Sequence, residues 1–285
     1  MMNTITLELD EAAIRSLQSA FPANQQNTNV AYTRFQIKTE GCTITVYTSN
    51  KVVFSGKRAA ALAAPYQPKR TSVQLPMGGS DEVGTGDYFG PVVVCACIVN
   101  DEDMPVLTPL NIMDSKQLTD DTMRAQAPLL MERLSYSLLI LDNVRYNKVH
   151  ATQNLNTIKA KLHNKAYVNL SHKTRLPDFS VVDQFMEKSK YYTAIQQEPE
   201  IIRNLHFETK AENKYIAVAC ASIIARYGFL KTMDQMGETY STVFPKGAGA
   251  HVDSFGREFV QRYGEEALQK VAKVHFINST RILDK

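Results

Sequence analysis

Two adjacent acidic residues, Asp81 and Glu82, precede a glycine-rich turn that leads into an apolar segment, residues 91–99. Strong acids beside a buried strand are costly to hold there, because like charges repel and burial penalises ionised groups. Such a pair usually persists when a cation neutralises it. These residues therefore predict a site for divalent cations, with the glycines allowing a substrate backbone to come close.

Two further acids stand where predicted elements end or begin. Asp183 closes the short apolar strand predicted over 179–183, and Glu212 opens a long helix predicted over 212–233. Hard cations such as Mg²⁺ take carboxylate oxygens as ligands, and two such ions about 4 Å apart can activate a water and stabilise the leaving oxygen of a phosphodiester. Each acid alone could instead cap an element or pair with a base, and Glu212 would suit the start of a helix.

The neighbouring positions of Asp81 and Glu82 raise a geometric question. Successive residues of a regular strand point to opposite faces of a sheet. The two acids therefore share one site only if the strand bends or is offset, which the glycines at 78–79 and Gly84 permit.

The elements that must position these acids fall into two domains joined by a proline-rich basic linker. Residues 1–66 predict the order strand, helix, three strands and helix, hence a small α+β domain with one free sheet face. Residues 67–76 form the linker. Residues 77–285 alternate strands with helices, which indicates an α/β domain. The expected strands are 4–9, 31–38, 43–48, 51–55, 77–83, 91–99, 135–142, 179–183 and one within 201–209, and the expected helices are 11–21, 57–64, one reaching 133, 147–169 with a break at 154–156, and 212–233.

Composition and charge narrow the class of protein. The chain has 285 residues, 44% of them hydrophobic, which suffices for a sizeable core. Its four cysteines form no CxxC pair, so we expect reduced thiols and a cytoplasmic location. No leader or membrane span is expected. Residues 1–76 carry eight Lys or Arg residues against four acids, whereas the remainder is near neutral. The first domain is therefore a candidate for binding a polyanion, although a generally basic surface is an alternative.

Four segments, in the expected order, together resemble the type 2 ribonuclease H family. They are GSDEVGTG at 79–86, FGPVV at 89–93, DSKQL at 114–118 and ACASIIAR at 219–226. The threonine at position 85, a glutamate as fourth acid and about 75 additional N-terminal residues are similar to the ribonuclease HIII branch. In that branch the N-terminal extension resembles the TATA-binding-protein fold and binds the substrate.

The resemblance implies cleavage of the RNA strand of an RNA/DNA hybrid with Mg²⁺ or Mn²⁺, leaving 5′-phosphate and 3′-hydroxyl ends. It also implies a ribonuclease H-like catalytic domain, and we expect the enzyme to be a monomer. The resemblance further implies which residues act. The catalytic acids would be Asp81, Glu82, Asp183 and Glu212, the first three binding metal, and the substrate would be contacted by Gly84, Thr85, Gly86, Ser115 and Lys116.

Some assignments stay open. Glu208 could replace Glu212 as the fourth acid, although Glu212 has the preferred spacing of ten residues to Ser222. The roles of Arg226 and Lys246 are undecided. Two rival functions also remain, namely cleavage at single embedded ribonucleotides, as in ribonuclease HII, and a non-catalytic protein that binds hybrids. Intact acids at four positions favour an enzyme.

Overall fold

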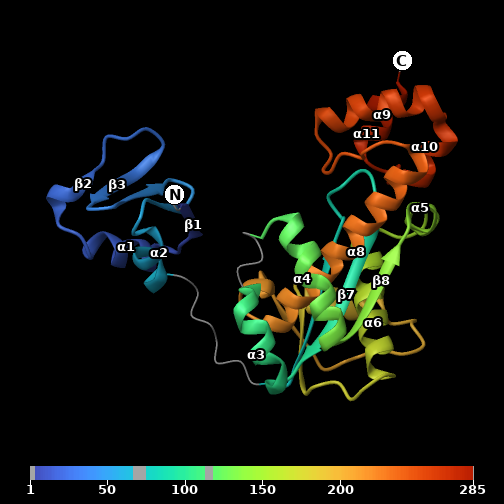
Figure 1. The fold of residues 1–285 in the computed structure, drawn as a ribbon, viewed down its shortest axis with the longest axis horizontal. Helices are drawn as coiled ribbons and strands as arrows, with labels where there is room; N and C mark the ends of the chain where they lie inside the picture. The colour runs from blue at the N-terminus through green and yellow to red at the C-terminus, as the bar shows by residue number, and fades with distance from the viewer. Residues whose placement is uncertain (1–3, 67–74, 113–117, 285) are drawn as a thin grey trace. The chain divides into compact units, whose positions relative to one another are not determined.

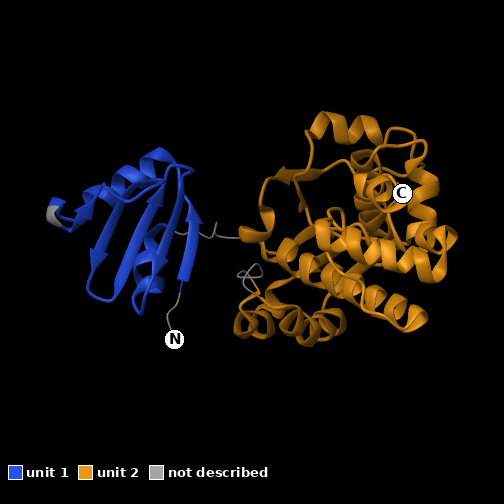
Figure 2. Cartoon of the chain, turned by 90° about the horizontal axis from the view of Figure 1, so that it is seen from above, with its two compact units in different colours: residues 1–69 blue, residues 70–285 orange. Residues whose placement is uncertain are grey.

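The structure, a computed structural model, describes residues 4–66, 75–112 and 118–284. The chain divides into two compact units, residues 1–69 and 70–285, which Figure 2 colours blue and orange. The predicted linker between the two domains falls largely in the undescribed segment 67–74, so its extent stays a prediction. Each unit has its own hydrophobic core, and each is described by itself.

The first unit is a five-stranded antiparallel sheet in the order β1-β5-β4-β3-β2, with its helices packed on one face. Alternation along β3 buries Phe35 and Ile37, while Gln36 and Lys38 face away from the core. Asp10 caps the first helix, because its carboxylate accepts the Ala13 amide at 2.8 Å. The elements are β1 (Thr4–Glu8), α1 (Glu11–Ser19), β2 (Gln26–Asn27), β3 (Thr33–Thr39), β4 (Cys42–Tyr47), β5 (Lys51–Ser55) and α2 (Ala59–Ala63).

The second unit is built on a mixed five-stranded sheet in the order β10-β9-β6-β7-β8. The strands β6, β7 and β8 pair antiparallel, whereas β9 runs parallel to β6 and β10 parallel to β9. The carboxyl ends of β6, β9 and β10 therefore meet at one edge of the sheet. The strands are β6 (Met77–Val83), β7 (Val92–Val99), β8 (Ser135–Leu141), β9 (Phe179–Asp183) and β10 (Leu205–Glu208).

Helices cover both faces of this sheet (Figure 1). The long helix α8 packs on one face against β6 and β7, with α4 beside it, while α6 packs on the other face. The helices are α3 (Met104–Leu107), α4 (Asp120–Arg133), α5 (Asn143–His150), α6 (Leu155–Ser171), α7 (Lys188–Ala194), α8 (Ile216–Tyr240), α9 (Ala250–Tyr263), α10 (Glu265–Val271) and α11 (Ile277–Leu283).

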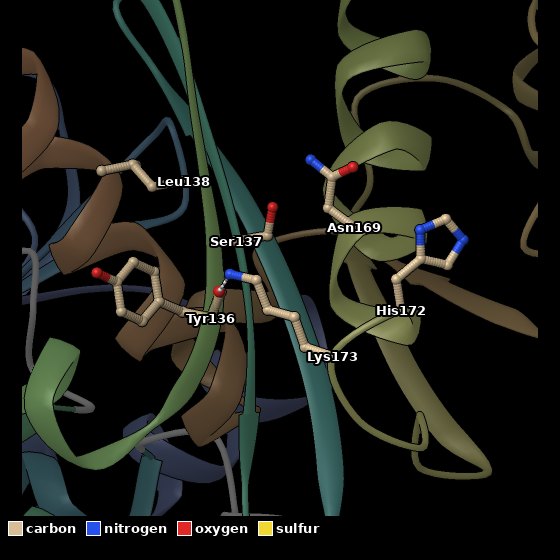
Figure 3. Close-up of a pocket in the computed structure, with 6 residues that line it drawn as sticks. All are labelled: Tyr136, Ser137, Leu138, Asn169, His172 and Lys173. Atoms are coloured by element: carbon tan, nitrogen blue, oxygen red, sulfur yellow. Dashed lines mark hydrogen bonds between the residues drawn. The ribbon is translucent and has the colours of Figure 1, made fainter.

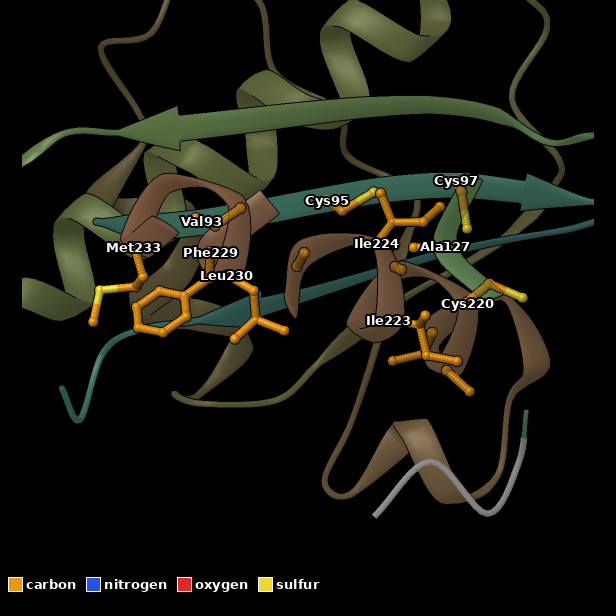
Figure 4. Packing of buried hydrophobic residues seen from close by; sticks show 14 of the residues in the cluster. Val93, Cys95, Cys97, Ala127, Cys220, Ile223, Ile224, Phe229, Leu230 and Met233 are labelled. Carbon is orange, nitrogen blue, oxygen red and sulfur yellow. The ribbon is translucent and has the colours of Figure 1, made fainter. Parts of the chain in front are cut away.

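The core between α8 and the sheet is shown in Figure 4. Buried residues such as Cys95 on β7 and Ile224 and Phe229 on α8 contribute to it. Among the described helices, α8 alone is long and apolar enough to cross a membrane, but 72% of its most apolar window is buried inside the protein. Its composition is therefore explained by its place in the core.

Two expectations need correction. The long helix begins at Ile216, so Glu212 does not open it; Glu212 lies in a separate 3₁₀ turn, Ala211–Asn213. The left-handed backbone of Lys210 and the extended Tyr215 on either side interrupt the helical path there. The break between α5 and α6 lies at 151–154, just before the predicted position, because Asn154 caps α6 by accepting from the Thr157 amide at 2.9 Å.

Candidate active site

Asp81 and Glu82 lie on a regular strand and face opposite sides of the sheet. The ladder between β6 and β7 runs without a bulge from Met77 to Val83, and it pairs Asp81 with Cys95. Cys95 belongs to the core under α8, whereas its neighbour Val94, opposite Glu82, belongs to the core under α6. The strand therefore does not bend to bring the two carboxylates together.

Asp81 is buried on the α8 side, where its side chain is hydrogen-bonded to Ser222 of that helix. Its Oδ1 also accepts the Glu82 amide at 2.7 Å. Burial, reinforced by the charges of Glu82 and then Asp183, raises the pKa of Asp81 well above its usual value. The two hydrogen bonds work in the opposite direction but do not offset these effects.

Glu82 is held on the α6 side by two buried bases. Its Oε1 accepts from Lys159 Nζ at 2.5 Å, and its Oε2 is 2.9 Å from His163 Nε2. The other imidazole nitrogen lies 2.8 Å from Ser80 Oγ. Burial tends to raise the pKa of Glu82, but His163 and Lys159 outweigh it and hold the pKa below its usual value. Lys159 also stands 3.9 Å from the centroid of the Phe185 ring.

Asp183 ends β9 beside the end of β6. The register pairs Ser80 with Val182, so the next positions, Asp81 and Asp183, are neighbours at the carboxyl ends of parallel strands. Asp183 Oδ1 accepts the Ala211 amide at 2.9 Å, which connects β9 to the turn that carries Glu212. A third acid in the same row is Glu208 of β10, which pairs with Asp183 in the ladder.

Glu208 and Glu212 have different surroundings. The Glu208 carboxylate forms an ion pair with Lys214 and lies 3.5 Å from His206, and Lys214 is the first of the causes that lower its pKa. Glu212 is 7% exposed, and its Oε1 accepts from Asn213 Nδ2 at 3.2 Å. Glu208 is therefore partly exposed and paired with a neighbouring lysine, whereas Glu212 is buried in the turn whose Ala211 amide contacts Asp183.

The carboxylate oxygens of these acids are the type of ligand that a hard divalent cation prefers. Asp81 and Asp183 present carboxylate oxygens from adjacent strands, and like charges held together in a buried site favour a cation between them. Within the described ranges, no three carboxylate, imidazole or thiol side chains converge closely enough to hold a metal ion as they stand. The orientation of Glu82 toward Lys159 and His163 contributes to this divergence.

The glycine turn that follows β6 has a fixed base and an open tip. Gly84 and Gly90 both have positive φ, at 91° and 86°. A Cβ on Gly84 would lie 2.2 Å from the Pro91 carbonyl oxygen, but one on Gly86 would meet no atom of the described residues within 4 Å beyond its two chain neighbours. The Asp87 carboxylate accepts the Gly247 amide at 2.6 Å, so the glycine loop after Lys246 is bound to this turn.

Comparison with known proteins identifies the family. The family model described as Ribonuclease HII matches residues 78–279, and a domain of unknown function, DUF3378, matches residues 4–75. The chain is 39% identical to ribonuclease HIII of Exiguobacterium sibiricum over 298 residues, which cover 98% of this chain and 96% of that protein. It is 35% identical to ribonuclease HIII of Bacillus cereus, covering 99% of each.

The chain belongs to the ribonuclease HIII family. The crystal structure of Bst-RNase HIII in complex with Mn²⁺ has the same fold, with a TM-score of 0.71 at 34% identity over 99% of this chain and 98% of that one. Both the expected type 2 ribonuclease H assignment and the two-domain α/β architecture are confirmed. As a member of this family, the chain is a metal-dependent endoribonuclease that acts on RNA/DNA hybrids.

The two basic residues whose roles the sequence left open, Arg226 and Lys246, both contact one acidic residue. Asp120, at the start of α4, accepts from Arg226 Nε at 2.9 Å and pairs with Lys246. Arg226 therefore contacts the Asp120 carboxylate. Ser115 and Lys116, the predicted phosphate contacts, lie outside the described residues, and their role stays a prediction.

The main residues that sequence reasoning missed are Lys159 and His163. They lie four residues apart on α6, hence on one face of that helix, and both are buried. Two bases at this spacing on the face of the helix that also carries buried apolar residues are the signal that could have indicated a buried acid opposite them.

The cavity drawn in Figure 3 is lined by residues other than these acids. It measures about 540 Å³ and lies between the outer strand β8 and the end of α6. Lys173 spans it and donates to the Tyr136 carbonyl at 3.0 Å. The described residues that line this cavity include no carboxylate, so it offers no ligands of the kind that the ribonuclease needs.

Proposed function

We propose that Asp81 and Asp183 are the principal ligands of the divalent cations with which this ribonuclease cuts the RNA strand of its hybrid substrate. One observation carries the proposal. The two acids meet at the carboxyl ends of adjacent parallel strands, where burial and the nearby charges raise the pKa of Asp81. A bound cation relieves this repulsion, because it stabilises the ionised carboxylates that burial disfavours.

Glu212 is our choice for the fourth acid. It is buried, and its neighbour Ala211 is hydrogen-bonded to Asp183, whereas the Glu208 side chain is 31% exposed at the edge of the row. Glu82 stays a predicted metal ligand. To reach a cation held by Asp81, its carboxylate has to turn away from the two bases on α6.

The rest of the proposed chemistry follows from this assignment. Bound Mg²⁺ or Mn²⁺ would supply Lewis-acid activation of the attacking water and of the phosphodiester, giving 5′-phosphate and 3′-hydroxyl ends. The turn Gly84, Thr85 and Gly86 would contact ribose 2′-hydroxyls, the groups that distinguish RNA from DNA. The exposed tip at Gly86 supports close approach of a nucleic-acid backbone.

We further propose that the first unit binds the hybrid through the sheet face that its helices leave open. That face carries Gln36 and Lys38, and the excess of Lys and Arg over acids in residues 1–76 suits the binding of a phosphate backbone. A monomer in the cytoplasm is our working proposal for the state and location of the protein.

Four single substitutions test the acids. Asp81→Asn and Glu212→Gln should abolish cleavage of an RNA/DNA hybrid across a Mg²⁺ and Mn²⁺ titration, whereas Glu208→Gln should retain it. Lys214→Met serves as the control for loss of the Glu208 ion pair. Cleavage at the normal rate by Asp81→Asn would refute the metal-site assignment, and loss of cleavage confined to Glu208→Gln would transfer the fourth role to that residue.

The substrate preference is tested with the wild-type chain. A hybrid with a continuous RNA strand should be cut more efficiently than a DNA duplex that contains one ribonucleotide. The opposite preference would favour the rival function, cleavage at embedded ribonucleotides.

A further inference from the structure

A fully buried lysine lies behind the glycine turn. Lys273 is 0% exposed, and its Nζ donates to the backbone carbonyls of Asp87 at 2.7 Å and Gly90 at 2.5 Å. Burial lowers the pKa of Lys273 to about 7, while the charge of Asp87 opposes this shift. A buried ammonium is costly, so its persistence requires compensating hydrogen bonds. The two carbonyl oxygens that accept from Lys273 both belong to the turn.

Further bonds tie the same stretch to the C-terminal part of the chain. The Lys273 amide donates to the Tyr88 carbonyl at 2.8 Å, and the Gly90 amide donates to the Val271 carbonyl at 2.9 Å. From α5, Asn143 Nδ2 donates to the Gly90 carbonyl at 2.9 Å. The base of the turn is therefore bound from residues far away in the sequence, while its tip at Gly86 is exposed.

We propose that Lys273 is a positioning residue that holds the turn 84–90 in the conformation in which it meets the RNA strand. The inference rests on the proposed contact between Gly84–Gly86 and ribose. It goes further, because it assigns the conformation of the turn to a lysine almost two hundred residues away in the sequence. Gly84 and Gly90 have no side chains with which to fix the turn themselves.

The chemistry of lysine suits this task in either protonation state. An ammonium has three N–H donors and a neutral amine has two, so both carbonyls remain bonded when the proton is lost. The titratable groups around it are Asp87, the Tyr146 ring at 6.0 Å, and His275. The pKa of His275 is lowered to about 4 by burial and by the nearby His150 and Lys273. A methionine has similar length but no donor, so it would leave both carbonyls without this partner.

The test compares Lys273→Met with a matched control, Asn164→Ala, in the full-length chain. Asn164 is also buried and also forms two bonds to backbone, donating to Glu200 O at 2.7 Å and accepting from the Ile202 amide at 3.0 Å, but neither partner belongs to the turn. Both variants are made with Asp81→Asn to prevent cleavage. Equilibrium binding to an RNA/DNA hybrid and to a DNA duplex of the same sequence gives the discrimination ratio, and amide hydrogen exchange reports order in residues 84–90.

Lys273→Met should reduce the hybrid-over-DNA discrimination ratio by about tenfold and speed exchange in the turn, whereas Asn164→Ala should keep both at the level of the parent. An unchanged ratio and unchanged exchange in Lys273→Met would overturn the proposal, even if the variant is less stable. Should Lys273→Met not fold, Asn143→Ala removes another donor to Gly90 and should shift the same two measurements in the same direction; no shift there would equally overturn it.

The proposed function can fail separately. If the wild-type chain neither cuts the hybrid nor prefers it to the DNA duplex, the assignment of the turn to RNA is wrong. Hydrogen exchange would still decide whether Lys273 orders the turn, since that measurement needs no substrate.

Discussion

The ion pair between Lys159 and Glu82 offers a sharp test of how the acidic site is supported. Replacing Lys159 with methionine keeps an unbranched apolar chain near Phe185 and removes the ammonium. The Glu82 carboxylate stays buried with only His163 to compensate it, because the side chains of Lys159 and Glu82 are 9% and 12% exposed. We therefore expect the pKa of Glu82 to rise and the fold to lose stability.

The magnitude follows from this burial. Removing one partner of a buried ion pair costs about 3–5 kcal/mol, and the remaining bond from His163 places the expected loss near the lower end, about 3 kcal/mol. For a domain of this size, about 2–4 °C per kcal/mol converts the loss into a melting temperature lower by about 6–12 °C.

The same helix supplies the control. Lys161 pairs with Glu198 at 3.1 Å, but the two side chains are 34% and 29% exposed, so solvent screens the pair. Lys161→Met should cost less than about 1 kcal/mol. Thermal and urea denaturation of both variants, in buffer with a chelator, measure the difference. Equal losses in the two variants would refute the reasoning, since they would mean that Glu82 does not depend on the buried lysine.

Three further outcomes are expected. Gly86→Ala should leave the melting temperature unchanged but weaken hybrid binding. Gly84→Ala should destabilise the fold by at least about 1–2 kcal/mol, because Gly84 has a positive φ and a Cβ there would contact Pro91. Equal melting temperatures of the two variants would contradict this expectation. Since the unfolded pKa of Lys273 is 10.5 and the folded value is about 7, the unfolded chain binds more protons between these values. Stability relative to Lys273→Met should therefore rise with pH by up to about 1.4 kcal/mol per unit in that window; a flat or falling difference in denaturation experiments would disprove the shift. Deleting residues 1–70 should weaken hybrid affinity far more than single-turnover cleavage, and unchanged affinity in a titration would argue against a substrate-binding role for the first unit.

Much of the fold was predictable because local patterns are strong where strands are buried. The strands at 77–83 and 179–183 have their predicted bounds, and each carries an acid at or near its carboxyl end. The helical region expected over 147–169 is found, although it begins at Asn143. The first unit follows the expected order of elements except for the short strand β2, which was not expected. The three C-terminal helices were not predicted, because their amphipathic patterns are short and their packing partners lie elsewhere in the chain.

The sequence by itself determined the inventory of the site: acids at strand ends, glycines beside them, and a family resemblance that the comparisons confirm. It could not determine where each carboxylate points, because that depends on the register of β6 and on which helix covers each face. Only the tertiary structure placed Asp81 under α8 and Glu82 against Lys159 and His163. The tertiary structure also showed that Glu212 lies in a 3₁₀ turn before α8 and that Lys273 lies behind the glycine turn.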